Sequence, residues 1–294
     1  MRRGAVIATW SFALLLSAAT AGCSGPCALR RNLQDPPTPE QAARIQQKSE
    51  RAQAALDRGD LEQARMELLQ LVAETPGSAQ AHLRLGKILQ LQGRLDESET
   101  CFRRALALDP DFVDALIGLG SIEAAKGDPQ SAMKRFETAV EIEPQDAEAH
   151  FACAGVLESM GRTDEALAAY FRTLEFNPLH PEVTQRIGAI QLARKQPDQA
   201  LARLDQAVDL APESGEARLL RGRAHLMLGH IPQSIADFRA AAQHLPNRPD
   251  VHYHLALALD AAHQRDDALK AVDQALRLAP NDVDARGLSQ RLRR

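Results

Sequence analysis

Proline returns at a fixed interval of 34 residues through most of this 294-residue chain. Seven prolines keep the spacing: Pro76, Pro110, Pro144, Pro178, Pro212, Pro246 and Pro280. Because proline makes up only about 5% of ordinary sequences, seven matches at fixed positions do not arise by chance. Proline cannot continue a helix, since it lacks an N–H donor and its ring clashes with the preceding turn. We therefore expect each proline to follow the end of a helix in a repeated unit.

Three further positions of the repeat hold side chains of constant size. Twelve residues before each proline stands a small residue: Ala64, Ser98, Ala132, Ala166, Ala200, Ser234 and Ala268. Twelve residues earlier stands another: Ala52, Gly86, Gly120, Ala154, Gly188, Gly222 and Ala256. Eight residues before each proline stands a bulky one: Leu68, Phe102, Phe136, Tyr170, Leu204, Phe238 and Val272. Helices approach closely only where the crossing side chains are small, so the pattern predicts two packed helices in every unit.

The middle of each unit carries a residue suited to a left-handed turn. Five units place glycine there: Gly59, Gly93, Gly127, Gly161 and Gly229. Glycine has no Cβ and adopts a positive φ without strain, so it commonly ends a helix. Lys195 and His263 take this place in units five and seven, where the same conformation costs each residue about 1–2 kcal/mol. The expected unit is therefore a helix, a tight turn and a second helix.

This pattern resembles the tetratricopeptide repeat family, and its clearest copy is "AHLRLGKILQLQGRLDESETCFRRALALDPDF" in unit two. The resemblance implies an all-α fold, an α-solenoid of seven 34-residue helix-turn-helix units that forms a right-handed superhelix with a concave groove. The expected array spans 38–282, with units at 45–78, 79–112, 113–146, 147–180, 181–214, 215–248 and 249–282. Thr38 and Gln41 form a capping-box pattern at its start. Residues 283–294 are predicted to form a polar capping helix.

The N-terminus has the order of a secretory signal. Arg2 and Arg3 precede an apolar stretch over residues 6–16, and small residues fill 17–22. Positive charge, apolar core and small-residue end are the three parts of a signal peptide, which we place at residues 1–22. Residues 23–37 follow as a linker, because Ser24, Gly25 and Pro26 suit a flexible tether.

The sequence "TAGC" before this linker resembles a bacterial lipobox, in which a lipid is attached to the cysteine. Cys23 is then the lipid attachment site, although the family usually has leucine where Thr20 stands. Two alternatives stay open. The triplet Ala19-Thr20-Ala21 fits ordinary cleavage, which gives a secreted or periplasmic soluble protein, and an uncleaved segment gives a membrane anchor. The expected location is the bacterial cell envelope, as a membrane-anchored lipoprotein.

Charge and cysteine content exclude several classes of protein. The net charge is −4, and the first 31 residues hold four arginines and no acid, so residues 32–294 carry −8. Such a chain lacks the basic surface that binds phosphate backbones, and we expect no nucleic acid partner. Cys101 and Cys153 are isolated within helical patterns and are interpreted as small buried residues rather than a zinc or disulfide framework.

Motifs of catalysis are missing from the sequence. It contains no H-E-x-x-H, G-x-S-x-G or Walker pattern, and no separate domain remains beside the repeats and the leader. His82, His150 and His252 share one repeat position and are interpreted as helix-packing residues rather than metal ligands. We therefore predict no enzyme activity, no cofactor, no metal and no small-molecule substrate.

In the family that this chain resembles, the first helix of each unit lines the groove. Its fifth place holds Ser49, Leu83, Ile117, Phe151, Gln185, Leu219 and Tyr253, of which five are apolar. They form either a surface for a partner peptide or a partly buried part of the array. Arg84, Lys87, Arg186 and Arg223 are placed to meet carboxylates, but the asparagines of the family's chaperone-tail clamp are missing, so that function is not carried over.

Acids hold the second place of the same helices: Asp114, Glu148, Glu182, Glu216, Asp250 and Asp284. Acids in a first helical turn complement the helix dipole. They also edge the groove, where they favour a basic ligand.

Unit six departs from the others. Arg221 and His225 occupy places that are apolar in several other units, while Leu219, Leu220, Leu226 and Met227 fall on or near the groove face. Either Arg221 extends out of the core towards water, or unit six exposes an apolar binding patch. On the second interpretation, glutamate at 219 or 227 weakens partner capture without unfolding the array. The complete predicted binding surface is Leu83, Arg84, Lys87, Ile117, Phe151, Arg186, Leu219, Arg223, Leu226, Met227 and Tyr253.

The expected function is that of a non-catalytic scaffold or adaptor that is displayed in the bacterial envelope and binds protein partners. Similar exported tetratricopeptide lipoproteins are adaptors in envelope assembly. Two alternatives remain: an accessory subunit that regulates an envelope enzyme, and a homo-oligomer that stacks through its terminal repeats. The sequence distinguishes neither the partner nor the pathway.

Overall fold

The computed structural model describes residues 38–294, and the predicted signal peptide, tether and Cys23 lie outside these residues. The chain divides into two units, Met1–Ala43 and Arg44–Arg294, and all the packing described below belongs to the second. No helix within residues 38–294 combines the length and apolar character needed to span a bilayer.

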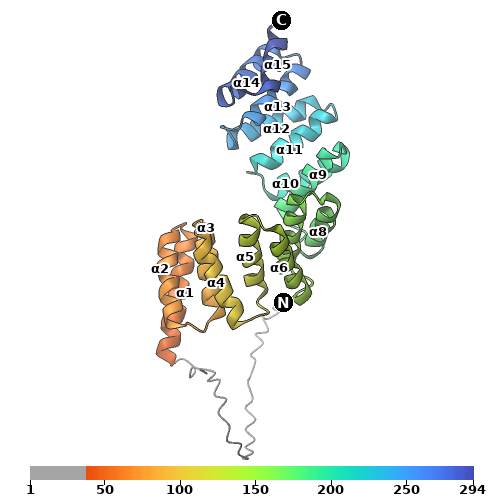
Figure 1. The fold of residues 1–294 in the computed structure, drawn as a ribbon. Coiled ribbons are helices and arrows are strands. Elements are labelled where there is room, and N and C mark those ends of the chain that lie inside the picture. The colour runs from red at the N-terminus through yellow and green to blue at the C-terminus, as the bar shows by residue number, and fades with distance from the viewer. Residues whose placement is uncertain (1–37) are drawn as a thin grey trace, which may run out of the picture. The chain divides into compact units, whose positions relative to one another are not determined.

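Residues 38–294 form helices that follow one another in antiparallel pairs, with no strand among them (Figure 1). The first helices of the pairs are α1 (Pro39–Asp57), α3 (Ala79–Leu91), α5 (Val113–Ala125), α7 (Ala147–Ser159), α9 (Pro181–Ala193), α11 (Gly215–Met227) and α13 (Pro249–Ala261). The second helices are α2 (Leu61–Glu74), α4 (Leu95–Leu108), α6 (Pro129–Ile142), α8 (Thr163–Phe176), α10 (Pro197–Leu210), α12 (Ile231–His244) and α14 (Arg265–Leu278). The predicted all-α solenoid of helix pairs is confirmed.

The helix boundaries follow the predicted start and stop signals. Thr38 caps α1 as a capping box, because its Oγ1 accepts from the Gln41 backbone N–H at 3.3 Å while Gln41 Oε1 accepts from the Thr38 N–H at 2.9 Å. Each repeat proline lies two residues beyond the end of a second helix, as Pro76 does after α2. Proline therefore ends every unit in the same place.

The constant-size positions meet at the helix crossings. All seven bulky side chains are at most 2% exposed. A Cβ built on Gly86 would lie 2.7 Å from the Phe102 ring, and one built on Gly118 would lie 2.6 Å from the same ring. Both distances are shorter than any contact between non-bonded carbon atoms. The Phe102 ring of α4 therefore fits only because α3 and α5 each have a glycine at the point of contact. One phenylalanine thus joins two successive units.

The histidines at a shared repeat position hold the loop between units. His82, His150 and His252 place Nε2 at 3.2, 2.9 and 2.9 Å from the carbonyl oxygens of Pro76, Pro144 and Pro246. In unit six Arg218 takes their place and donates Nε–H to the Pro212 carbonyl at 3.0 Å. Each histidine ring therefore gives a hydrogen-bond partner to the carbonyl oxygen of a loop proline, which lies outside the hydrogen bonds of the helices. This agrees with the packing role predicted for these histidines.

The last helix, α15 (Val283–Arg293), covers the end of the array. Leu288 and Leu292 are 3% and 4% exposed and pack in the cluster that α13 and α14 form. The residues on the other side, such as Arg286 and Gln290, are polar and exposed. The helix therefore buries the apolar end of the last pair and presents a polar surface.

The two cysteines of the repeats differ in burial. Cys153 is 7% exposed and Cys101 is partly buried. Burial raises the pKa of the Cys153 thiol to about 12, so this thiol stays protonated and unreactive at neutral pH. The prediction of buried packing cysteines is confirmed for Cys153.

The turns within the pairs are left-handed, as predicted. The five glycines have φ between 74° and 85°, while Lys195 has φ 57° and His263 has φ 58°. The two side chains thus adopt a conformation that normally favours glycine, at a cost of about 1–2 kcal/mol each.

We predict that Lys195→Gly stabilises the protein by about 1 kcal/mol, because it removes the left-handed strain and only part of that gain is lost to the greater freedom of glycine in the unfolded chain. Chemical denaturation followed by circular dichroism measures the change. Lys126→Gly is the matched control: Lys126 has a right-handed φ of −81° one residue before a turn glycine, and its replacement is expected to destabilise. A Lys195→Gly variant no more stable than the native chain would contradict the strain argument.

Candidate functional site

Several first helices of successive pairs lie against one another along one face of the array, whereas α7 and α9 approach each other less closely. Contacts join α3 to α5, α5 to α7, α9 to α11 and α11 to α13. The side chains on this face come from several different units, so a ligand that lies along the face contacts several helices. Two hollows are lined mainly by these first helices.

The hollow nearer the N-terminus, the α1–α3 hollow, has a volume of about 360 Å³. Leu56 of α1 and Leu91 of α3 give it apolar walls, and Leu91 is 67% exposed. Arg84 and Lys87 of α3 also line it. Lys87 is paired with Asp114 at 2.8 Å, which leaves little net charge at that edge.

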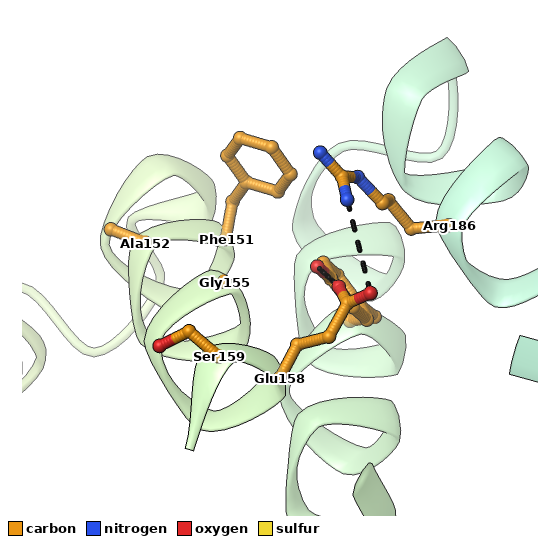
Figure 2. A pocket seen from close by; sticks show the side chains of 7 residues that line it. Phe151, Ala152, Gly155, Glu158, Ser159 and Arg186 are labelled. Carbon is orange, nitrogen blue, oxygen red and sulfur yellow. Dashed lines mark hydrogen bonds and ion pairs between the residues drawn. The ribbon is translucent and has the colours of Figure 1, made fainter. Parts of the chain in front are cut away.

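The second hollow, the α7–α9 hollow, has a volume of about 420 Å³ and lies between the first helices of units four and five (Figure 2). Phe151, Ala152, Gly155, Glu158 and Ser159 come from α7, Tyr170 comes from α8 and Arg186 comes from α9. In Figure 2 the Phe151 ring and the Arg186 guanidinium face each other across the opening.

Gly155 leaves part of this hollow open, where α7 and α9 also lack the contacts that several other successive first helices make. A Cβ built on it would meet nothing within 4 Å, in contrast to the crowded glycines at the helix crossings. The same repeat position holds Lys87 in unit two, Ala189 in unit five and Leu257 in unit seven. The packing of the helices therefore does not require glycine here, and its effect is to leave space beside Phe151.

The polar groups of the α7–α9 hollow differ in how well they are satisfied. Tyr170 donates its O–H to Glu158 Oε2 at 2.7 Å, and burial together with this carboxylate raises the pKa of Tyr170. Arg186 lies 3.8 Å from Glu158 Oε1 and 3.5 Å from Glu182 Oε1, and its side chain is 47% exposed. Charge-assisted hydrogen bonds are about 2.7–2.9 Å long, so Arg186 keeps N–H groups for a ligand.

The row of acids in the first helical turns is largely paired within the chain. Asp114 pairs with Lys87, Glu182 lies near Arg186, and both Glu216 and Asp250 pair with Arg248. These cations offset the charge at the groove edge. The expectation that the acids favour a basic ligand therefore loses its basis at four of the six positions.

The predicted binding residues separate by exposure. Arg84, Lys87, Arg186 and Met227 are exposed; Ile117, Phe151, Arg223, Leu226 and Tyr253 are half-buried. Leu83 and Leu219 are only 2% and 1% exposed, so the expectation that they lie open to a partner is wrong. Leu83 packs with Phe102 and Leu219 packs with Phe238, since the fifth place of these helices turns into the crossing. Of the predicted residues, the hollows gather Leu83, Arg84, Lys87, Phe151 and Arg186, and Leu83 reaches the α1–α3 hollow with only a small part of its surface.

Arg221 in unit six is held inside the array and does not extend into water. Its Nε and Nη2 donate to the two carboxylate oxygens of Asp237 at 2.8 and 2.7 Å, and Nη1 donates to Asp205 at 3.2 Å. Asp237 is only 4% exposed, and its hydrogen bond holds the pKa of Arg221 above its usual value. Sequence reasoning missed Asp237 because the partner lies sixteen residues away on the next helix.

The lining of the two hollows shows no arrangement typical of a cofactor site or of catalysis. Residues 38–294 hold no cluster of three or more His, Cys, Asp or Glu side chains placed for a metal ion. In the hollows, the hydroxyl of Ser159 and the carboxylate of Glu158 have no neighbouring histidine among the lining residues. The apolar side chains of Phe151 and Ala152, which lie beside the Arg186 guanidinium, suit contact with a side chain or a peptide.

Comparison with known families agrees with this geometry. Residues 50–231 match the family model described as the cilia and flagella-associated protein 70 middle TPR-like domain, where TPR denotes the tetratricopeptide repeat. Residues 249–282 match the model of the tetratricopeptide repeat itself. A comparison with curated protein sequences finds no match.

Solved structures share the fold at low sequence identity. A chain of the APC/C hetero-tetramer Cut9–Hcn1 has a TM-score of 0.69 and 17% identity, with 82% of this chain and 48% of that chain covered. Pseudomonas aeruginosa pilF has a TM-score of 0.67 and 19% identity, over 72% of this chain and 97% of that one. A Parabacteroides merdae tetratricopeptide repeat protein has a TM-score of 0.55 and 16% identity, with 86% of this chain and 100% of that chain covered. The chain thus spans about half of the Cut9–Hcn1 chain, and the likeness shows the fold alone.

The stacked helix pairs and the lined face define a tetratricopeptide-type α-solenoid, a class of proteins that bind protein partners and are typically non-catalytic scaffolds. Since the first family model covers more than half of the sequence, the chain belongs to the family of TPR-like domains which that model describes.

We predict different effects on stability for glutamate at two positions of α11 that lie eight residues apart. Leu219→Glu places a carboxylate where the native side chain is 1% exposed and is expected to cost roughly 3–5 kcal/mol of stability. Met227→Glu changes a side chain that is 49% exposed and is expected to stay within about 0.5 kcal/mol of the native chain. Urea denaturation compares the two variants. Equal stability of both would mean that the burial assigned to Leu219 is wrong.

Proposed function

We propose that this protein is a non-catalytic scaffold that is displayed in the bacterial envelope and holds a segment of a partner protein in the α7–α9 hollow. The observation that carries the proposal is the open space beside Gly155, between a half-buried aromatic ring and an arginine with free donors. Neither the packing of the helices nor the turn between them needs this space.

The lining of the hollow indicates which segment fits. Ala152, Gly155 and the Phe151 ring offer apolar contact to one side chain of a peptide. Arg186 offers N–H groups to a carboxylate, and its contacts with Glu158 and Glu182 are long enough to be exchanged. An extended segment with an apolar residue beside an acidic one matches both features.

Envelope display rests on the leader. The signal-like residues 1–22 and the lipobox-like "TAGC" support export and a lipid anchor at Cys23, with residues 23–37 as the tether. Pseudomonas aeruginosa pilF shares the fold, and the likeness is of the fold only.

Of the alternatives, the accessory subunit uses the same hollow, with an envelope enzyme as the partner. Stacking through the last repeat is disfavoured by the polar outer side of α15.

We predict that Gly155→Leu blocks partner binding without harming the fold. Leucine occurs at this repeat position in unit seven as Leu257, and the Cβ meets nothing within 4 Å, so the side chain extends into the hollow. A photo-crosslinker at Ala152, used in native envelopes, is expected to give a discrete adduct that falls at least about tenfold in the Gly155→Leu background.

Gly287→Leu is the matched control, because Gly287 is also a helical glycine whose Cβ position is open, and it lies in α15 away from the hollow. This variant is expected to keep the adduct. Loss of the adduct in both variants, or in neither, would contradict binding in the α7–α9 hollow. An adduct with a second copy of this chain would favour the homo-oligomer instead.

The proposed lipid attachment and membrane location are tested separately at Cys23. The native chain is expected to incorporate labelled fatty acid and to sediment with membranes, whereas Cys23→Ser is expected to lose the label and to stay as an unprocessed precursor. Cys27→Ser is the control, since it removes a nearby thiol and leaves "TAGC" intact. If native and Cys23→Ser chains are both unlabelled and both membrane-bound, an uncleaved anchor replaces the lipoprotein.

A further inference from the structure

Two histidines face each other across the turn of unit six. His225 lies in the last turn of α11, and His230 is the residue that precedes α12. Their Nδ1 atoms are 3.3 Å apart and their ring centroids are 5.5 Å apart. A neutral imidazole carries one N–H and one lone pair, so one ring donates to the other and a single proton lies between two nitrogen atoms.

This separation is also the separation of two ligands on one metal ion. Imidazole nitrogen binds Zn²⁺ at about 2.0–2.1 Å, and two ligands at the tetrahedral angle are then about 3.3 Å apart. The two Nδ1 atoms therefore already have the spacing of adjacent ligands. For both to bind one metal ion, the donor ring moves its proton from Nδ1 to Nε2, so that both rings stay neutral and both Nδ1 lone pairs face the ion after small ring rotations. Both residues are held by helices on either side of one tight turn.

The surroundings support a cation. Nε2 of His225 is 4.0 Å from Oδ2 of Asp237, which is too long for a hydrogen bond but places a negative charge beside the ring. Asp237 and Asp205 together carry two negative charges against the single positive charge of Arg221. The local charge without the histidines is thus −1, which favours a divalent ion over an unoccupied histidine pair.

The histidine pair has no role in the repeat itself. Unit five has Gln191 and Gln196 at the two positions, and unit seven has Leu259 and Gln264. His230 makes no side-chain hydrogen bond to the start of α12, although it stands at the capping position. It is also exposed, so water or a partner's side chain reaches any ion that it binds.

We propose that His225 and His230 form a two-histidine site for a divalent transition metal ion of the Zn²⁺ type, which joins α11 to α12. Imidazole is a ligand suited to Zn²⁺, Cu²⁺ and Ni²⁺, and the remaining coordination positions are open. The site is independent of the α7–α9 hollow, because none of its residues lines that hollow. The sequence alone does not single it out, because an H-x₄-H pair with no accompanying cysteine pair is only half of a zinc-finger pattern.

The test is a titration of the untagged full-length chain with ZnCl₂ by isothermal calorimetry. The native chain is expected to bind one ion at this site. His225→Gln and His230→Gln introduce residues that unit five carries at these positions, and each is expected to weaken binding at least about tenfold, because a single histidine holds the ion poorly. His252→Gln is the matched control, and it is expected to leave this affinity unchanged.

A second measurement does not depend on any variant. In NMR spectra of the native chain, Zn²⁺ is expected to shift the ring resonances of His225 and His230, while those of His82, His150 and His252 stay in place. Two outcomes would overturn the proposal. One is saturable zinc binding that is equal in the native chain and in a variant that carries both His225→Gln and His230→Gln, and the other is no saturable binding and no shift of the two rings.

Discussion

The contact on which the array depends is that of a bulky side chain on a second helix against a small residue on the first. Phe102 shows it most clearly, since its ring lies against Gly86 of its own unit and Gly118 of the next, both so close that no Cβ fits. A rigid ring thereby fixes the crossing of three helices. Because the same contact recurs in every unit, the rest of the solenoid follows from its repetition.

Departures from the repeat produce the features that distinguish this chain. Gly155 stands where other units carry Lys87 or Leu257, and it opens a hollow without disturbing the crossing at Ala154 and Tyr170. A scaffold of this kind keeps the crossing residues constant and varies the residues beside them. Under the proposed function, recognition and stability are carried by different positions of the same helix, so a binding surface can change while the fold is kept.

Unit six shows how far the core tolerates polarity. Arg221 occupies a place that is Leu85 in unit two and Ile187 in unit five, yet the array keeps its regular pairs there. The guanidinium is accepted because Asp237 satisfies it with two hydrogen bonds, and burial of either group alone would be costly. Burial also lowers the pKa of His225, which therefore loses its positive charge more readily than a solvated histidine.

The sequence alone determined the helix pairs, the turn positions and the residues at the crossings, because these depend on local chemistry that repeats every 34 residues. Proline, glycine and small residues act within a turn or two of the chain, so their spacing is enough. Only the tertiary structure decided which apolar residues of the first helices are open. Leu219 and Phe151 hold the same repeat position, but Leu219 is buried and Phe151 lines a hollow, since exposure depends on neighbours from adjoining units.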